Sequence, residues 1–463
     1  MSAITESELI DPANGAAFTT VPRIAGGEAA AIVARAVDAQ PSWAATPLPV
    51  RAQILLDAAE RLRAARVEIV SDLAREGGKV RSEAEGEVEK SIDTFRYYAG
   101  LAGGLDGRSF SGGRPGLRHE IRIEPVGVVL AITPWNVPMA SPARKIAPAL
   151  LAGNAIIVKP AERTPLSSLH LRAALDAAGV PNDVVQVATG SGSDLGNALV
   201  LAERVDAVSF TGSTVVGMDI KQKLSDRLTR LQLELGGKNA AIVMPDADLQ
   251  QAVNWITVGA FAGTGQQCTG TSRVIVHKDI AEQFVSMLEA AIDNIHQKGS
   301  SSSPVIGPLI SQLHRQTVHG FVSRALDEGA KVTRGGTIPQ GSGYFYPPTL
   351  IVDAARDSEI NIEEVFGPVV TVIVANDLED AIHICNNTSY GLSAAVHTRD
   401  LGVAETVAAA TVAGVVAING PTSGIELPAP FGGFKLSGTE SKEHGPESLR
   451  FYTRTKLVSW GQP

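Results

Sequence analysis

Three side chains in the sequence suit covalent chemistry on a carbonyl group. Cys268 lies in a segment of small residues, 261–270, where the backbone can come close to a ligand, and a cysteine thiolate is a good nucleophile. Glu234 ends an apolar run, so burial would raise its pKa toward neutrality and make it a base for a thiol or a water. Asn136 lies in a turn between two prolines and could donate a hydrogen bond to an oxyanion.

Each of these residues also has a purely structural interpretation. A free cysteine is commonly a small buried hydrophobe, a glutamate can be a salt-bridge partner, and an asparagine can simply form a turn. Taken one at a time, the three residues leave both interpretations open. The other cysteine, Cys385, falls on an expected amphipathic helix and is interpreted as core. The nine histidines suggest no nucleophile–base pair, which disfavours a cysteine–histidine hydrolase.

The segment 210–217 suggests a second kind of chemistry, the binding of an anion. Here an apolar strand runs into a turn at Gly212 and then into an expected helix, whose first N–H groups and positive dipole end suit a pyrophosphate. The glycine spacing differs from the dinucleotide-binding pattern G-x-G-x-x-G, and the segment 190–196 misses that pattern by one residue. Neither segment identifies a dinucleotide site by itself.

The elements that must position these residues follow from the apolar pattern. Residues 28–100 have apolar positions at helical spacing and are expected to form a helical entry layer. The expected strands of a first sheet are 126–132, 155–158, 184–187, 207–210 and 231–235, and those of a second are 240–244, 273–276, 369–374 and 415–418, with a helix at 280–295. This alternation predicts two parallel sheets covered by helices, and ligands bind at the carboxyl ends of such strands.

Composition limits the classes of protein to which the chain can belong. Its 463 residues predict two or three lobes, and 44% hydrophobic with 19% charged residues indicates a folded α/β protein. The net charge of −9 disfavours nucleic acid or a membrane as partner and favours a small-molecule substrate. Two distant cysteines indicate a reducing compartment, and because the N-terminus has no signal segment, the expected location is the cytoplasm. The polar segment 299–304 is interpreted as a surface loop.

Together these segments resemble the aldehyde dehydrogenase superfamily over nearly the whole chain. Further motifs that carry the resemblance are 145–150, 152–162, 363–368, 390–392 and 430–438. The resemblance implies an α/β fold with a Rossmann-type cofactor domain (1–105 and 126–235) and an α/β catalytic domain (236–432). It also implies a small β oligomerisation arm (106–125 and 445–463), and hence a homodimer or homotetramer.

The resemblance implies roles for individual residues. Cys268 would be the nucleophile, Glu234 the base that activates the hydrolytic water, and Asn136 with the Cys268 backbone N–H the oxyanion hole. The implied cofactor-binding residues are Ile132, Thr133, Pro134, Trp135, Lys159, Ala161, Glu162, Gly192, Phe210, Thr211, Gly212, Ser213, Val216, Leu235, Gly236, Glu364 and Phe366. No metal is required. Because the Glu162 carboxylate would bind ribose hydroxyls and repel a 2′-phosphate, NAD⁺ is expected, with NADP⁺ possible.

Arg144 is the strongest indication of the substrate. At this position many members of the family that this chain resembles that oxidise simple aldehydes have an aromatic residue, whereas members of the succinate-semialdehyde type have arginine. A guanidinium facing the substrate would pair with a remote carboxylate, and Phe431 is expected to line the same pocket. The segment 419–426 also resembles enzymes of α-ketoglutaric semialdehyde. Ala262 replaces the second arginine of succinate-semialdehyde enzymes, which argues against succinate semialdehyde itself.

The prediction is therefore NAD(P)⁺-dependent oxidation of a short, acid-bearing semialdehyde to a carboxylic acid, through a cysteine thiohemiacetal and thioester. The alternative is a broad-specificity or aromatic aldehyde dehydrogenase. A remote alternative is a dinucleotide-binding scaffold without catalysis, which the joint presence of the three reactive side chains disfavours.

Overall fold

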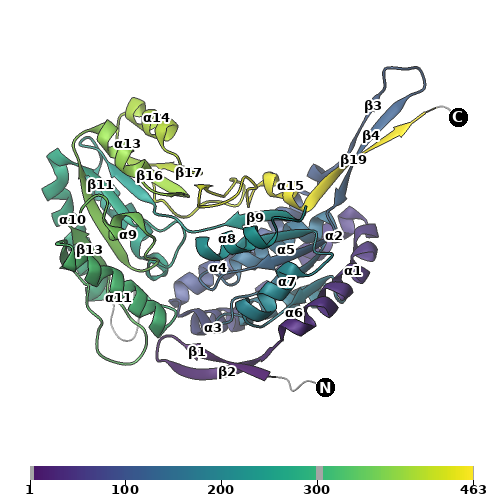
Figure 1. The fold of residues 1–463 in the computed structure, drawn as a ribbon, viewed down its shortest axis with the longest axis horizontal. Helices are drawn as coiled ribbons and strands as arrows, with labels where there is room; N and C mark the ends of the chain where they lie inside the picture. The colour runs from purple at the N-terminus through teal and green to yellow at the C-terminus, as the bar shows by residue number, and fades with distance from the viewer. Residues whose placement is uncertain (1–4, 299–305, 462–463) are drawn as a thin grey trace.

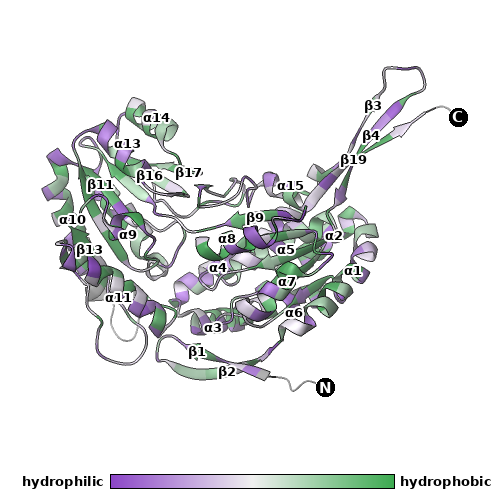
Figure 2. Cartoon of the chain, in the orientation of Figure 1, coloured by the Kyte–Doolittle hydropathy of each residue, from purple (hydrophilic) through white to green (hydrophobic). Residues whose placement is uncertain are grey.

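The computed structural model describes residues 5–298 and 306–461, so the expected loop at 299–304 lies outside the described residues. The chain forms two α/β lobes, each built around its own sheet, and a β arm that projects away from them (Figure 1). Figure 2 shows hydrophobic residues along the strands of both large sheets. Among the described residues, no helix has the length and hydropathy needed to cross a membrane.

The first lobe contains a five-stranded parallel sheet in the order β7-β6-β5-β8-β9. Its strands are β5 (Val128–Ile132), β6 (Ala155–Lys159), β7 (Val185–Val187), β8 (Ala207–Thr211) and β9 (Arg230–Glu234). These strands confirm the predicted runs, with ends that shift by one or two residues. The strand order reverses between β5 and β8, and such a reversal opens a crevice at the carboxyl ends of the strands.

Helices cover both faces of this sheet. They are α1 (Ala29–Ala45), α2 (Leu48–Ala64), α3 (Arg66–Gly77), α4 (Arg81–Gly100), α5 (Ala140–Ala152), α6 (Leu166–Ala177), α7 (Asn197–Leu201) and α8 (Thr214–Lys223). Successive residues of β5 point to opposite faces: Val129 joins the core beneath α2 and α5, while Leu130 joins the core beneath α1. Burial on both faces explains why β5 is apolar throughout.

The second lobe contains a seven-stranded sheet in the order β12-β13-β14-β11-β10-β16-β17, in which β12 alone is antiparallel to its neighbour. Its strands are β10 (Ala240–Val243), β11 (Arg273–His277), β12 (Lys331–Arg334), β13 (Thr349–Val352), β14 (Val369–Ala375), β16 (Ser393–His397) and β17 (Val415–Ile418). The helices are α9 (Leu249–Phe261), α10 (Ala281–Lys298), α11 (Gln312–Asp327), α12 (Glu359–Ile362), α13 (Leu378–Asn386) and α14 (Leu401–Ala410). The predicted strands and the helix at 280–295 are confirmed, whereas β12, β13 and β16 were not predicted.

The arm is a three-stranded antiparallel sheet of β3 (Arg108–Ser111), β4 (Arg118–Pro125) and β19 (Thr453–Trp460), with β4 in the centre. The expected C-terminal arm segment, 445–463, divides in two. Its first part forms a short 3-10 turn and α15 (Leu449–Tyr452), whose side chains join the core of the first lobe, and the arm strand begins at Thr453.

Two smaller strand pairs complete the fold. A hairpin of β1 (Thr5–Asp11) and β2 (Ala16–Arg23) lies beside the first lobe (Figure 1). Its turn also reaches the second lobe, because the Tyr344 N–H donates to the carbonyl of Pro12. The pair of β15 (Tyr390–Gly391) and β18 (Phe434–Lys435) joins the C-terminal segment to the second lobe. The chain beyond β18 then returns to the first lobe, where Leu235 N–H donates to Ser437.

Candidate active site

The predicted cofactor residues of the first lobe gather at the carboxyl ends of its strands. Ile132 and Thr133 end β5, Lys159 ends β6, Phe210 and Thr211 end β8, and Glu234 ends β9. Parallel strands present these ends at one edge of the sheet, which is where ligands bind in this kind of fold. Pro134 and Trp135 continue from β5, Ala161 and Glu162 follow β6, and Leu235 and Gly236 follow β9.

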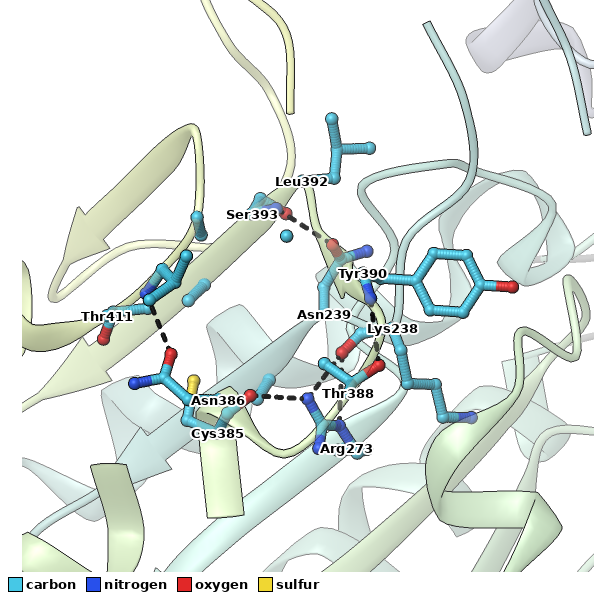
Figure 3. A pocket seen from close by; sticks show the side chains of 15 residues that line it. Lys238, Asn239, Arg273, Cys385, Asn386, Thr388, Tyr390, Leu392, Ser393 and Thr411 are labelled. Carbon is cyan, nitrogen blue, oxygen red and sulfur yellow. Dashed lines mark hydrogen bonds between the residues drawn. The ribbon is translucent and has the colours of Figure 1, made fainter. Parts of the chain in front are cut away.

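The loop that carries Cys268 is held from both lobes. The side-chain amide of Asn239 donates to the carbonyls of Cys268 (2.8 Å) and Gly270 (2.9 Å). The oxygen of this amide accepts the Ser393 N–H (Figure 3). Gly265 has a positive φ of 67°, and a Cβ there would lie 2.2 Å from the carbonyl of Gly367. Only glycine fits this close approach, so the small residues before Cys268 allow the loop to bend.

The thiol of Cys268 is half-buried and, without a ligand, protonated at neutral pH. Burial, followed by the carboxylates of Glu364 and Glu234, raises its pKa to about 12 against the opposing charge of the Arg144 guanidinium. Formation of the thiolate therefore needs a base or an additional positive charge nearby. Arg144 and Glu234 are therefore near enough to the thiol for their charges to change its pKa.

Asn136 packs directly against the Cys268 loop. One N–H of its side-chain amide donates to the carbonyl of Gln266 at 2.8 Å, which leaves the second N–H for another acceptor. In the part of the chain that the structure describes, the backbone N–H of Cys268 donates to no protein acceptor. Two donors beside the thiol are thus free to meet a negative oxygen, as the oxyanion-hole prediction requires.

Glu234 is 2% exposed, and neither oxygen of its carboxyl group has a hydrogen-bond partner within residues 5–298 and 306–461. Burial raises its pKa well above the ordinary value, with a further contribution from the negative charge of Glu443. Gly432 packs against it, and a Cβ there would lie 2.7 Å from the Glu234 carboxyl. A buried carboxyl group without partners is costly, which excludes the salt-bridge interpretation for this glutamate and favours a chemical role.

Beneath Glu234 lies a buried ion pair between Lys145 and Glu443, which the sequence pattern did not reveal. Lys145 is fully buried on α5, and its amine also donates to the Ser209 hydroxyl at 2.8 Å. Ser209 in turn donates to the side chain of Gln232 at 2.7 Å. The pair places a proton-bearing amine and a carboxylate near the buried Glu234. The sequence signal was a lysine, Lys145, beside Arg144 in a helix whose other residues are mostly apolar.

The segment 210–217, which is predicted to bind the pyrophosphate of a dinucleotide, joins the end of β8 to the start of α8. β8 turns at Gly212 into α8, and the side chain of Ser213, the residue before the helix, makes no capping hydrogen bond. The first N–H groups of α8 are therefore available to a phosphate. Val216, on the first turn, is exposed.

The residues predicted to hold the adenosine ribose, Lys159 and Glu162, lie at the carboxyl end of β6 and just after it. The Glu162 carboxylate is exposed and accepts the Gly192 N–H at 2.9 Å, so Glu162 and Gly192, both predicted to bind the cofactor, are in contact. Lys159 is buried, and this burial lowers its pKa.

The second lobe contributes the other side of the pocket. The Phe366 ring packs edge-to-face on Trp135 of the first lobe, with ring centres 5.4 Å apart, and His314 joins them. The Nε2–H of His314 donates to the Phe366 carbonyl at 2.8 Å. The Glu364 carboxylate accepts the Gly237 N–H at 3.0 Å, and burial raises its pKa to about 7. The candidate cofactor site thus spans both lobes, and His314 was missed because it lies far from every motif in sequence.

Arg144 and Phe431 lie on two segments that face the reacting residues. Arg144 is half-buried on α5, next to Lys145, and its Nε atom has no partner. Phe431 is buried, pairs by backbone hydrogen bonds with Glu443, and stacks on the ring of His444 at 5.3 Å. Both predicted substrate residues therefore contact or adjoin the segment 443–444, which sequence reasoning overlooked.

Cys385, in contrast, lies among apolar side chains of the second lobe. It is 6% exposed in a core of the second lobe and lines a cavity of about 10 Å³, the size of one water (Figure 3). Arg273, in the same cavity, is occupied by the carbonyls of Lys238, Ile384 and Cys385. The core interpretation of Cys385 agrees with this burial.

Comparison with known proteins agrees with this geometry. The model of the aldehyde dehydrogenase family matches residues 2–458. The chain is 40% identical to alpha-ketoglutarate semialdehyde dehydrogenase of Haloferax volcanii, covering 98% of this chain and 95% of that protein. It is 39% identical to 2,5-dioxopentanoate dehydrogenase of Saccharolobus solfataricus (90% and 88% covered). It is 36% identical to an NAD⁺-dependent benzaldehyde dehydrogenase of Pseudomonas putida (98% and 93%).

Solved structures with bound cofactors share the fold. Betaine aldehyde dehydrogenase of Staphylococcus aureus in complex with NAD⁺ superposes with a TM-score of 0.94 at 32% identity, covering 98% of this chain and 91% of that one. A 3,6-anhydro-L-galactose dehydrogenase in complex with NADP gives 0.95 at 32% identity, with 99% and 97% covered. The chain therefore belongs to the aldehyde dehydrogenase family, NAD(P)⁺-dependent oxidoreductases that act on aldehydes.

Proposed function

We propose that the protein oxidises a short aldehyde with a remote carboxylate to the dicarboxylic acid, with NAD⁺ as the preferred cofactor. The observation that carries the proposal is Arg144, a half-buried cation that has no anionic partner among the described residues and acts electrostatically on the thiol of Cys268. A carboxylate bound to Arg144 would orient the aldehyde group toward that thiol. Relatives named for a five-carbon semialdehyde support the same substrate class.

The residues around Cys268 suit a two-step reaction. The thiolate adds to the aldehyde carbon, and the oxygen, now negative, accepts hydrogen bonds from the free N–H of Asn136 and the Cys268 N–H. A bound oxidised dinucleotide would supply the hydride acceptor and a positive charge that favours the thiolate. Loss of the hydride from that carbon leaves the acyl group as a thioester on Cys268. Glu234 then removes a proton from water as the water attacks the thioester, which releases the acid and regenerates the thiolate.

The residues present fit a dinucleotide. The uncapped start of α8 suits the pyrophosphate, Lys159 and Glu162 would hold the adenosine ribose, and Glu364 with Phe366 would hold the nicotinamide side. The exposed carboxylate of Glu162 favours NAD⁺ because it would repel a 2′-phosphate.

An aldehyde panel with NADH absorbance as readout tests the function. We expect 2,5-dioxopentanoate and 5-oxopentanoate to give a higher kcat/KM than pentanal, which has the same chain length but no carboxylate. Equal values for the three aldehydes would contradict the proposal. Product analysis with and without coenzyme A tests hydrolysis, since an acyl-CoA product would exclude Glu234 as the deacylating base.

Oxidation of an aromatic aldehyde is the second candidate. The benzaldehyde dehydrogenase relative favours it, as does the aromatic pair of Phe431 and His444. If benzaldehyde gives a higher kcat/KM than 5-oxopentanoate, this alternative is selected.

The arm supports an assembly of identical subunits. β19 is an edge strand that leaves the body of the molecule (Figure 1), with Leu457 59% and Trp460 47% exposed. An edge strand with exposed apolar side chains is suited to pairing with a second copy. We expect a dimer or tetramer in light scattering and a shift toward monomer for Leu457→Arg. The two free cysteines suit a reducing compartment such as the cytoplasm.

A further inference from the structure

Two cations near the segment 443–444 have no anionic partner among the described residues. In the part of the chain that the structure describes, neither Arg144 on α5 nor Lys90 on α4 forms an ion pair or a side-chain hydrogen bond. Both are half-buried, and Arg144 is near enough to contribute to the lowered pKa of Lys90, after burial. Like charges that are partly withdrawn from water need an anion to offset their desolvation and repulsion.

The nearby carboxylates are already bound elsewhere. Glu87, one turn before Lys90 on α4, accepts the N–H groups of Met139 and Ala140 at the start of α5. It also forms an ion pair with Lys79 at 3.0 Å. Glu443 is paired with Lys145. These contacts leave a net positive charge at Lys90 and Arg144.

His444 adjoins these cations in an unusual conformation. Its φ of 61° lies in the left-handed region, which is strained for a residue with a side chain. It is 2% exposed, yet neither nitrogen of its ring has a well-formed hydrogen bond. Burial, followed by the charges of Arg144 and Lys90, lowers its pKa well below the ordinary value against the opposing influence of the Glu426 backbone, so the ring is neutral near pH 7. A left-handed backbone, together with a buried ring whose contact to the Glu426 backbone is not a well-formed hydrogen bond, indicates a side chain placed to contact a ligand.

We propose that Lys90, Arg144 and His444, the anchor cluster, bind the end of the substrate remote from the aldehyde. Lys90 and Arg144 bind its carboxylate, and the neutral His444 hydrogen-bonds to an oxygen substituent on the carbon next to that carboxylate. The substrate class is thus a semialdehyde of a 2-oxo or 2-hydroxy acid. This inference rests on the proposed function and adds Lys90 and His444 as determinants of specificity.

Three five-carbon aldehydes separate the contributions of the cluster. Pentanal has neither feature, 5-oxopentanoate adds the carboxylate, and 2,5-dioxopentanoate adds the 2-oxo group. Lys90→Met keeps the length of the side chain and removes its charge, with Lys90→Arg as the matched control. His444→Asn removes the imidazole with a residue that tolerates the left-handed region.

The preference between two aldehydes is the quotient of their kcat/KM values. We expect Lys90→Met to lower the preference for 5-oxopentanoate over pentanal by roughly tenfold, mainly through KM, and Lys90→Arg to restore it. We expect His444→Asn to lower the preference for 2,5-dioxopentanoate over 5-oxopentanoate by roughly fivefold. Pentanal turnover in each variant shows whether the protein has folded, so a variant that loses it is replaced by Lys90→Gln or His444→Gly.

The outcomes distinguish the inference from the function on which it rests. If the unmodified enzyme does not prefer 5-oxopentanoate to pentanal, the proposed function fails. If that preference is present and Arg144→Leu removes it, but Lys90→Met and His444→Asn leave both preferences unchanged, the anchor cluster is wrong while the function stands.

Discussion

The reacting centre is formed by Cys268, Glu234 and Asn136. It differs from the anchor cluster in the charge carried by the groups that have no partner among the described residues. At the reacting centre, Glu234 has a buried carboxyl group without hydrogen bonds, and nearby carboxylates help to keep the Cys268 thiol protonated. In the anchor cluster, Arg144 and Lys90 have no anionic partner among the residues that the structure describes. The difference indicates that the reacting centre is arranged for proton transfer and the anchor cluster for binding a negative charge. Substitutions should therefore remove catalysis and carboxylate binding separately.

The largest effect is expected at the reacting centre. Cys268→Ser should lower kcat/KM by on the order of 10⁴-fold or more, because a hydroxyl is a much weaker nucleophile than a thiolate. Steady-state NADH formation measures it, and circular dichroism serves as a folding control. Residual activity within tenfold of the unmodified enzyme would mean that another group attacks the aldehyde.

The next largest effect concerns hydrolysis. Glu234→Gln should lower kcat by about 10²- to 10³-fold, because glutamine cannot accept the proton of the water. Stopped-flow absorbance should show one equivalent of NADH per active site followed by slow turnover. A variant that turns over without a burst would contradict the assignment of Glu234 to the second step.

The same variant tests the raised pKa of Glu234. Since the base must be ionised, kcat should rise with pH through that raised pKa, and this limb should vanish in Glu234→Gln. The folded-state pKa exceeds the unfolded value, so ionisation of Glu234 destabilises the fold as pH rises through the folded pKa. Glu234→Gln should therefore have the higher Tm at pH 8, and an equal or lower Tm would argue against the raised pKa.

A smaller effect is expected for the cofactor. Glu162→Gln should raise the kcat/KM with NADP⁺ relative to that with NAD⁺ by roughly tenfold, since it removes a negative charge expected near a 2′-phosphate. Steady-state kinetics with both cofactors measure this change. A preference of the unmodified enzyme for NADP⁺ would overturn the assignment of NAD⁺.

The smallest effect is expected at the second cysteine. Burial raises the pKa of Cys385, as it does that of Cys268, but Cys385 is packed in a hydrophobic core of the second lobe. Cys385→Ala should leave kcat/KM unchanged and lower the free energy of unfolding by about 1 kcal/mol. Loss of activity in a folded Cys385→Ala protein would contradict the assignment of a purely structural role to Cys385.

The sequence predicted the parts of the fold that depend on local pattern. Apolar runs that are buried on both faces, such as β5, could be located to within two residues. The strand β12, with two charged residues in four, and β16, with small residues, lacked that pattern, because their burial depends on the neighbouring strands.

The residues of the candidate site also fall into two groups, those that a local sequence pattern reveals and those that only the fold brings together. Cys268, Glu234 and Asn136 occur in recognisable segments, so their types and context were sufficient to propose them. The ion pair of Lys145 with Glu443 and the stacking of His444 on Phe431 join residues distant in sequence, and only the folded chain brings them together. Lys90 gave no signal because a lysine on an amphipathic helix is ordinarily solvent-exposed.

The most direct test of the division between the two regions compares two aldehydes, 5-oxopentanoate and pentanal, as substrates for the unmodified enzyme and for Arg144→Leu. We predict that the substitution lowers kcat/KM for the acid-bearing aldehyde by about 10- to 100-fold and leaves that for pentanal within about twofold. Equal losses with both aldehydes, or no loss with 5-oxopentanoate, would contradict the assignment of Arg144 to the substrate carboxylate.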